Sequence, residues 1–182
     1  MLSDTTRAFL ADVIGRPPRD EALWLEALTH GSTGHDRNYE RLEFLGDRVL
    51  GLSIAEWLHE TGRDSEGKLS QRLNALVSRA TCAQIARRIG LGAHMQLGKQ
   101  ARDDGGHDSD NILGDVMEAL LGASFVEQGF DATRAMVRRF SIPDTRRIAS
   151  AGRAASDCGP IGPDTGEGHW TKCPIACALQ QS

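Results

Sequence analysis

The sequence predicts an all-α fold. Over about the first 140 residues, apolar side chains recur at three- and four-residue spacings, which is the period of an amphipathic helix. Stretches that alternate apolar and polar residues, as half-buried strands do, are scarce there. Glycines separate the periodic segments, at positions where helices commonly end. We therefore expect one helical domain over residues 1–142.

Seven segments carry this helical period. Asp20, just before Glu21, opens the second segment, and Ser65 precedes the fourth, so each is placed as an N-cap. Gly62 and Gly129 follow the third and sixth segments, where they would end a helix. The expected helices are Leu2–Ile14, Asp20–Thr29, Asn38–Glu60, Gly67–Val77, Arg79–Ile89, Ser109–Gln128 and Asp131–Phe140, and the polar stretch Ala101–Asp110 is expected to be a loop.

The composition suits a globular domain and excludes few functions. Of the 182 residues, 40% are hydrophobic, which is enough for a sizeable core. The formal net charge of -4 does not indicate a nucleic-acid binder, but bound divalent cations would offset clustered acids at a contact surface. The chain's first residues lack the pattern of a signal peptide, and no apolar run approaches the roughly 20 residues of a membrane span. We therefore expect a cytoplasmic protein with no membrane partner.

The third expected helix carries acids on one face. Glu40, Glu43 and Asp47 fall at i, i+3 and i+7, which places three carboxylates along one side of a helix. A solvated acidic face is the common explanation of such spacing. The opposite side is expected to be apolar and to consist of Leu42, Leu45, Val49, Leu52 and Trp57.

The sixth expected helix carries a second acidic pair. Asp115 and Glu118 are separated by three residues and share a helical face, and their neighbours are small or apolar. A helix this apolar is expected to be largely buried. Two buried acids are costly unless they are paired or bind metal.

Two packed helices with two carboxylates each would suit a hard divalent metal. Magnesium prefers carboxylate oxygens, water and phosphate oxygens, and such ions activate water and stabilise charge on a phosphodiester. The spacing alone leaves a nuclease and another carboxylate metal site both open. A di-iron bundle is disfavoured, because that chemistry uses Glu-x-x-His pairs and the pair here is Asp115-x-x-Glu118.

Four segments resemble ribonuclease III. Asn38–Leu50, which contains the string ERLEFLGD, closely resembles the family signature. Ala27–Ser32 is similar to the family's threonine-histidine-x-serine segment, and Glu66–Ser70 to its acidic turn and following helix. Asn111–Ala123 is similar to its second acidic helix. The resemblance covers residues 2–140, about the length of the family's nuclease domain.

The resemblance implies specific roles for the acids. It makes Glu43, Asp47, Asp115 and Glu118 the metal ligands, with Asp47 and Glu118 central to catalysis. The metal would be Mg²⁺, with Mn²⁺ as an alternative, and no organic cofactor is expected. Glu40 and Glu66 are expected in the outer part of the cleft, as members of the acidic cluster or as RNA contacts.

The resemblance also implies an assembly and a reaction. The family fold is all-α and forms a symmetric homodimer, and Phe44 is a candidate for the interface. Each site would cut one strand of double-stranded RNA and leave a 5′-phosphate and a 3′-hydroxyl, in RNA processing such as ribosomal RNA maturation. Cations that would contact the RNA backbone are Arg72, Arg79, Arg87, Arg88, Lys99, Arg102, Arg138 and Arg139, although most such side chains are simply solvated. The loop with Arg102 and His107 is the favoured RNA-facing element.

Residues 143–182 have a different composition. They contain four of the six prolines and five glycines, and we expect a disordered tail outside the family sequence, without a double-stranded-RNA-binding domain. A frameshift would explain the change, and resequencing the gene would test that hypothesis. Zinc binding by Cys158, His169, Cys173 and Cys177 is disfavoured, because the spacings form no C-x-x-C pairs.

A protein that binds duplex RNA without cutting it is the main competing hypothesis. Loss of an accessory RNA-binding domain would remove phosphate contacts and weaken affinity. The presence of every expected acidic ligand favours an active enzyme. Other residues have structural interpretations: His30 as a packing or capping residue, Cys82 as a small core residue, and Trp24 and Trp57 as core or interface residues.

Overall fold

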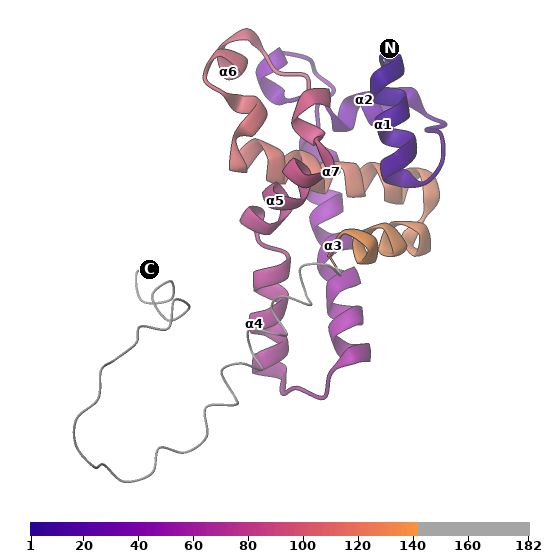
Figure 1. Ribbon diagram of the computed structural model, residues 1–182, viewed down its shortest axis with the longest axis vertical. Coiled ribbons are helices and arrows are strands. Elements are labelled where there is room, and N and C mark those ends of the chain that lie inside the picture. The colour runs from indigo at the N-terminus through magenta and orange to yellow at the C-terminus, as the bar shows by residue number, and fades with distance from the viewer. Residues whose placement is uncertain (142–182) are drawn as a thin grey trace, which may run out of the picture. The chain divides into compact units, whose positions relative to one another are not determined.

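The computed structural model describes residues 1–141. The predictions for the tail 143–182, including Cys158, His169, Cys173 and Cys177, concern residues outside that range. The predicted all-α class is confirmed: within the described part, strand pairing is limited to one isolated bridge between Thr29 and Gln96. The helices shown in Figure 1 are α1 (Asp4–Ile14), α2 (Glu21–Ala27), α3 (Glu40–Thr61), α4 (Glu66–Leu76), α5 (Arg79–Ile89), α6 (Lys99–Asp103) and α7 (Asp110–Gln128), followed by a helix over residues 130–141, with 3-10 turns at Gly31–Thr33, Leu91–His94 and Gly106–Asp108.

The helix starts follow from their caps. Helix α1 begins at Asp4 because the Ser3 hydroxyl accepts the N–H of Thr6 at 3.1 Å. The predicted cap at Asp20 is confirmed, since its carboxylate accepts the N–H groups of two α2 residues at 3.1 Å each. Ser65 occupies the N-cap position of α4, but its side chain makes no capping hydrogen bond.

The loop predicted for Ala101–Asp110 is wrong in part, because α6 and a 3-10 turn occupy it. Helix α6 is short and polar, so no apolar period reveals it in the sequence. The Gln100 amide donates to the Asp104 carboxylate at 3.0 Å, which stabilises this turn locally. Gly106 then packs so closely that a Cβ there would lie 2.6 Å from the Ala101 carbonyl oxygen.

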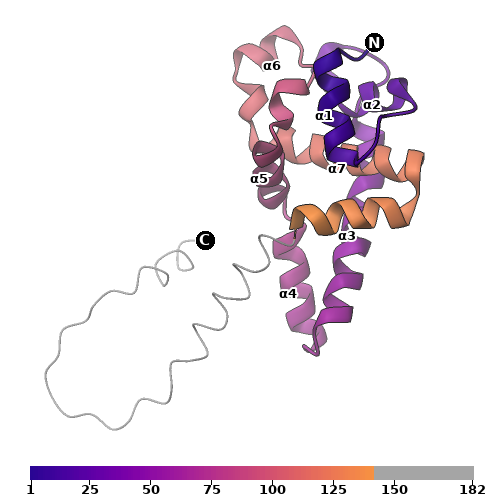
Figure 2. The same cartoon turned by 45° about the vertical axis from the view of Figure 1, so that its right-hand side comes forward.

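Helix α7 lies at the centre of the domain. It packs against α2, α3 and α5, and Figures 1 and 2 show it crossing the long α3. Its apolar residues are buried, among them Leu113, Val116 and Leu120, which confirms the prediction of a largely buried helix. No helix in residues 1–141 combines the length and apolar character needed to cross a membrane.

Two glycines allow the backbones of α3 and α7 to touch. A Cβ on Gly46 of α3 would lie 1.8 Å from the carbonyl oxygen of Glu118 on α7. A Cβ on Gly122 of α7 would lie 2.1 Å from the carbonyl oxygen of Leu42 on α3. Any side chain at either position would force the helices apart. This crossing therefore sets the distance between the acids of the two helices.

The outer side of α3 is less buried than expected. Leu42 and Val49 are buried as predicted, but Leu52 is 58% exposed, which corrects its assignment to the packed apolar side. Phe44 is 63% exposed. Trp24 is fully buried, in agreement with its predicted core position. Leu52 departs from the expectation because α7 covers only one side of α3, and the period of apolar residues does not specify how much of a helix is covered.

Candidate active site

The α3–α7 crossing brings the acids of the two helices together. Glu43 and Asp47 lie on either side of Gly46 in the first turns of α3, and Gly46 contacts the backbone at Glu118 of α7. Asp115 lies one turn before Glu118 on the same helix. The sequence predicts an acidic face on each helix, and the contact between the helices brings the two faces together.

Neighbouring carboxylates lie close enough to Glu118 and Glu43 to oppose their ionisation. Burial raises the pKa of Glu118 to about 7, and repulsion from Asp47, Glu43 and Asp115 adds to the effect. Burial and repulsion from Asp115 also raise the pKa of Glu43. Concentrated negative charge of this kind favours cation binding.

Asp115 has two polar neighbours. The Tyr39 hydroxyl donates to Oδ2 at 3.4 Å, and the Nε of Arg79 lies 3.2 Å from Oδ1. The Arg79 contact brings opposite charges together but is poorly aligned, so the buried Oδ1 accepts no hydrogen bond from residues 1–141. A buried carboxylate oxygen without a donor is costly, and it is free to bind a cation.

These acids fit a hard divalent metal in donor type, burial and charge. Carboxylate oxygens are the donors that Mg²⁺ and Mn²⁺ prefer. In the described residues, however, no three acid, histidine or cysteine side chains already converge as a closed ligand cage. Asp47 instead pairs with Arg48 at 2.6 Å, and Asp115 with Arg79. A bound ion would draw the carboxylates together through side-chain rotation.

The two outer acids lie in different places. Glu40 begins α3, and its carboxylate adds to the rise in the pKa of Glu43, so it belongs with the cluster. Glu66 begins α4, beyond the far end of α3, and accepts from the Ser70 hydroxyl at 2.9 Å. At 1.5 Å per residue, the end of α3 at Thr61 is roughly 20 Å from Asp47. A single chain therefore does not bring Glu66 to the other acids.

Sequence reasoning missed two contacts of this site. Tyr39 was not singled out, although it directly precedes the acidic face of α3. Cys82 is buried as predicted, but it also neighbours Glu118, and burial together with this carboxylate raises the pKa of its thiol to about 12.

His30 caps a 3-10 turn, with its Nδ1 3.0 Å from the backbone nitrogen of Ser32, which confirms its capping role.

Most cations expected to contact RNA already have partners. The ion pairs join Arg72 with Asp64, Arg79 with Asp115, Arg87 with Asp108 and Asp110, Lys99 with Asp103, and Arg138 with Glu56 and Glu60. Arg88 and Arg139 donate to the backbone carbonyls of Phe140 and Val13. Contact of these side chains with RNA would require them to exchange partners.

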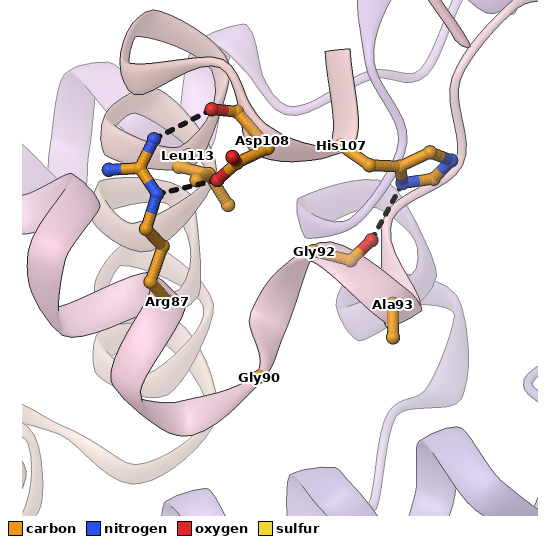
Figure 3. A pocket seen from close by; sticks show the side chains of 7 residues that line it. All are labelled: Arg87, Gly90, Gly92, Ala93, His107, Asp108 and Leu113. Atoms are coloured by element: carbon orange, nitrogen blue, oxygen red, sulfur yellow. Dashed lines mark hydrogen bonds and ion pairs between the residues drawn. The ribbon is translucent and has the colours of Figure 1, made fainter. Parts of the chain in front are cut away.

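A separate hollow of about 460 Å³ lies where α5 ends and α7 begins. Figure 3 shows Arg87 donating to the side chain and backbone carbonyl of Asp108, and His107 2.7 Å from the Gly92 carbonyl oxygen. None of the four predicted metal ligands lines it. Arg87 also pairs with Asp110, the first residue of α7, so these contacts join the end of α5 to the start of α7.

Comparison with known proteins identifies the family of the chain. Residues 20–145 match the family model described as Ribonuclease-III-like. Ribonuclease 3 of Zymomonas mobilis is 53% identical over 144 residues, which are 79% of this chain and 58% of that protein. Ribonuclease 3 of Rhodobacter capsulatus is 52% identical over 118 residues, 63% of this chain and 52% of that protein. The chain thus spans little more than half the length of these curated relatives.

A solved structure shares the fold. The nuclease domain of ribonuclease III from Campylobacter jejuni superposes with a TM-score of 0.70 at 37% identity, over 72% of this chain and 93% of that one. That structure is described as showing flexibility in a region involved in dimer formation. The family match over residues 20–145 includes both α3 and α7. The chain belongs to the ribonuclease-III-like family.

Proposed function

We propose that the chain is an endoribonuclease that hydrolyses double-stranded RNA with bound divalent metal. The observation that carries this proposal is the α3–α7 crossing, which gathers acids from two helices around a buried carboxylate oxygen without a donor. Family membership supports the same reaction. Phosphodiester hydrolysis needs activated water and neutralisation of developing charge, and clustered carboxylates that bind metal serve both needs.

Within this proposal, Glu43, Asp47, Asp115 and Glu118 would hold Mg²⁺ or Mn²⁺. A bound ion of this kind lowers the pKa of water and stabilises negative charge on the phosphodiester. The chain itself keeps the acids half-buried at a fixed helix crossing. Glu118 can carry a proton near neutral pH when no cation is present, because burial raises its pKa to about 7.

We also propose that the active form is a symmetric homodimer. Phe44 and Leu52 are exposed at 63% and 58%, and they lie eight residues apart on one side of α3. The guanidinium of Arg48 stacks over the Phe44 ring at 4.2 Å and also pairs with Asp47. An exposed aromatic and aliphatic side so close to the acids suits an interface beside the active site.

The resemblance to ribonuclease III supports further details of this function. We propose that the substrate is double-stranded RNA and that the products carry 5′-phosphate and 3′-hydroxyl ends. The enzyme would act in the cytoplasm, in RNA processing such as ribosomal RNA maturation. A two-fold dimer would present one site to each strand of a duplex, whose shape and backbone proteins read more readily than its base sequence.

The test is cleavage of a long labelled RNA duplex at low salt, with and without Mg²⁺. The full chain would be compared with Glu118→Gln and with Glu60→Gln, an acid on α3 that pairs with Arg138 away from the crossing. We expect Mg²⁺-dependent cutting that Glu118→Gln abolishes and Glu60→Gln retains. Duplex binding without cutting by the folded wild-type chain would support the binding-only alternative.

A further inference from the structure

Arg79 occupies a defined place beside the acids. It is the first residue of α5, directly after Ser78, whose hydroxyl caps that helix by accepting the N–H of Thr81 at 3.2 Å. Its Nε lies 3.2 Å from Oδ1 of Asp115. The Arg79 side chain is 57% exposed and the Asp115 side chain 18% exposed, so an exposed cation lies beside a mostly buried acid.

The packing of α5 on α7 makes room for this arginine. Gly114 directly precedes Asp115, and a Cβ on Gly114 would lie 2.6 Å from Cγ of Arg79 and 3.2 Å from its carbonyl oxygen. The arginine stem therefore lies against the α7 backbone at a residue without a side chain. This contact fixes the guanidinium over the acidic face, where an unconstrained arginine would extend into solvent.

The contact between Arg79 and Asp115 is close but weakly bonded. Oδ1 is buried and accepts no hydrogen bond, although the Nε lies within ion-pair distance. A well-aligned arginine–carboxylate pair would donate two parallel hydrogen bonds. The Arg79 guanidinium therefore compensates the charge of Asp115 without well-aligned hydrogen bonds. Another cation can replace the guanidinium at this carboxylate.

The charge of Arg79 affects other acids of the site besides Asp115. Arg79 also interacts electrostatically with Glu43 and Glu118. One exposed guanidinium therefore offsets part of the repulsion within the cluster. A divalent cation at the same carboxylates would offset it more strongly and would itself be repelled by Arg79.

We propose that Arg79 is the counterion of the acidic site. It compensates the charge of Asp115 in the metal-free protein and moves away from Oδ1 of Asp115 when a divalent cation binds. This inference rests on the proposed metal site. It assigns Arg79 a positioning role that sets metal affinity, where the sequence suggested only a general RNA-backbone contact. The arginine stabilises the empty site and weakens its hold on the ion.

The test is calorimetric titration of the full chain with Mn²⁺ at low ionic strength, in the absence of RNA. Arg79→Gln should bind Mn²⁺ more tightly than wild type, on the order of tenfold, because a positive charge beside the ion is removed. Arg79→Lys keeps the charge and should stay within about twofold of wild type. Arg87→Gln is the matched control, since Arg87 also lies on α5 but pairs with Asp108 and Asp110.

Thermal unfolding of the same variants gives a second readout. Without metal, Arg79→Gln should melt below wild type, and saturating Mn²⁺ should raise its melting temperature by more than it raises that of wild type. Equal or weaker Mn²⁺ binding by Arg79→Gln would overturn the counterion role while leaving the metal site in place. No Mn²⁺ binding by the folded wild-type chain would overturn the metal site and this inference together.

Discussion

Glu118→Gln should stabilise the metal-free protein while it abolishes cleavage. A carboxyl with an ordinary pKa of 4.5 is held at about 7 in the fold, chiefly by burial. At about 1.4 kcal/mol per pH unit, ionising it costs the folded state roughly 3 kcal/mol at pH 8. Solvent screening and the hydrogen-bonding needs of the amide reduce the expected gain in unfolding free energy to about 1–3 kcal/mol.

The pH dependence identifies the cause. Because the folded-state pKa lies above the unfolded one, the folded protein binds more protons between about pH 4.5 and 7. The stability of the metal-free wild type therefore falls as pH rises through that window, and Glu118→Gln removes this part of the fall. The advantage of the variant should shrink to under about 1 kcal/mol at pH 5.

Urea unfolding followed by helical circular dichroism, in EDTA at pH 8 and pH 5, measures both values. Glu127→Gln is the control on the same helix. Burial opposes ionisation of Glu127, but hydrogen bonds from the Asp20 N–H, the Trp24 indole and the Arg19 N–H outweigh it and lower its pKa, so that variant should lose stability. If Glu118→Gln is no more stable than wild type at pH 8, ionised Glu118 does not destabilise the folded, metal-free protein, and the reasoning is refuted.

Three further predictions concern the scaffold. Gly46→Ala should cost at least about 2–4 kcal/mol of unfolding free energy, because its Cβ would meet the α7 backbone, whereas Gly51→Ala on the same helix meets nothing within 4 Å and should gain up to about 1 kcal/mol. In sedimentation, Phe44→Asp should shift the chain from dimer to monomer, while Val126→Asp, 55% exposed on α7, should not; a dimeric Phe44→Asp protein would exclude this side of α3 as the interface. Asp20→Ala removes the carboxylate that caps α2 and should cost about 1 kcal/mol by urea titration; an unchanged midpoint would mean that the cap contributes nothing.

Much of the helical framework could be predicted from the sequence. Periodicity locates the long helices to within a few residues, and α5 spans the predicted range Arg79–Ile89. The short polar helix α6 was missed, because too few apolar residues mark it. The exposure of Leu52 was also missed, since periodicity assigns a residue to a side of a helix but not to a covering partner.

The sequence identified which residues form the acidic site, but it did not predict how the two helices bring them together. Helical spacing placed Glu43 with Asp47 and Asp115 with Glu118 on shared sides. Their convergence depends on the close crossing at Gly46 and Gly122, a contact between residues far apart in the chain. The pairing of Arg79 with Asp115 depends on that same tertiary packing, so sequence reasoning left Arg79 among several scattered cations.

The most direct test of the metal site is anomalous scattering from a crystal of the chain grown with Mn²⁺. We expect a Mn²⁺ peak at the α3–α7 crossing, bounded by carboxylate oxygens of Glu43, Asp47, Asp115 and Glu118 at about 2.0–2.3 Å. Manganese bound elsewhere, with the four carboxylates left without an ion in a saturated crystal, would contradict the assignment of these acids as the metal-binding centre.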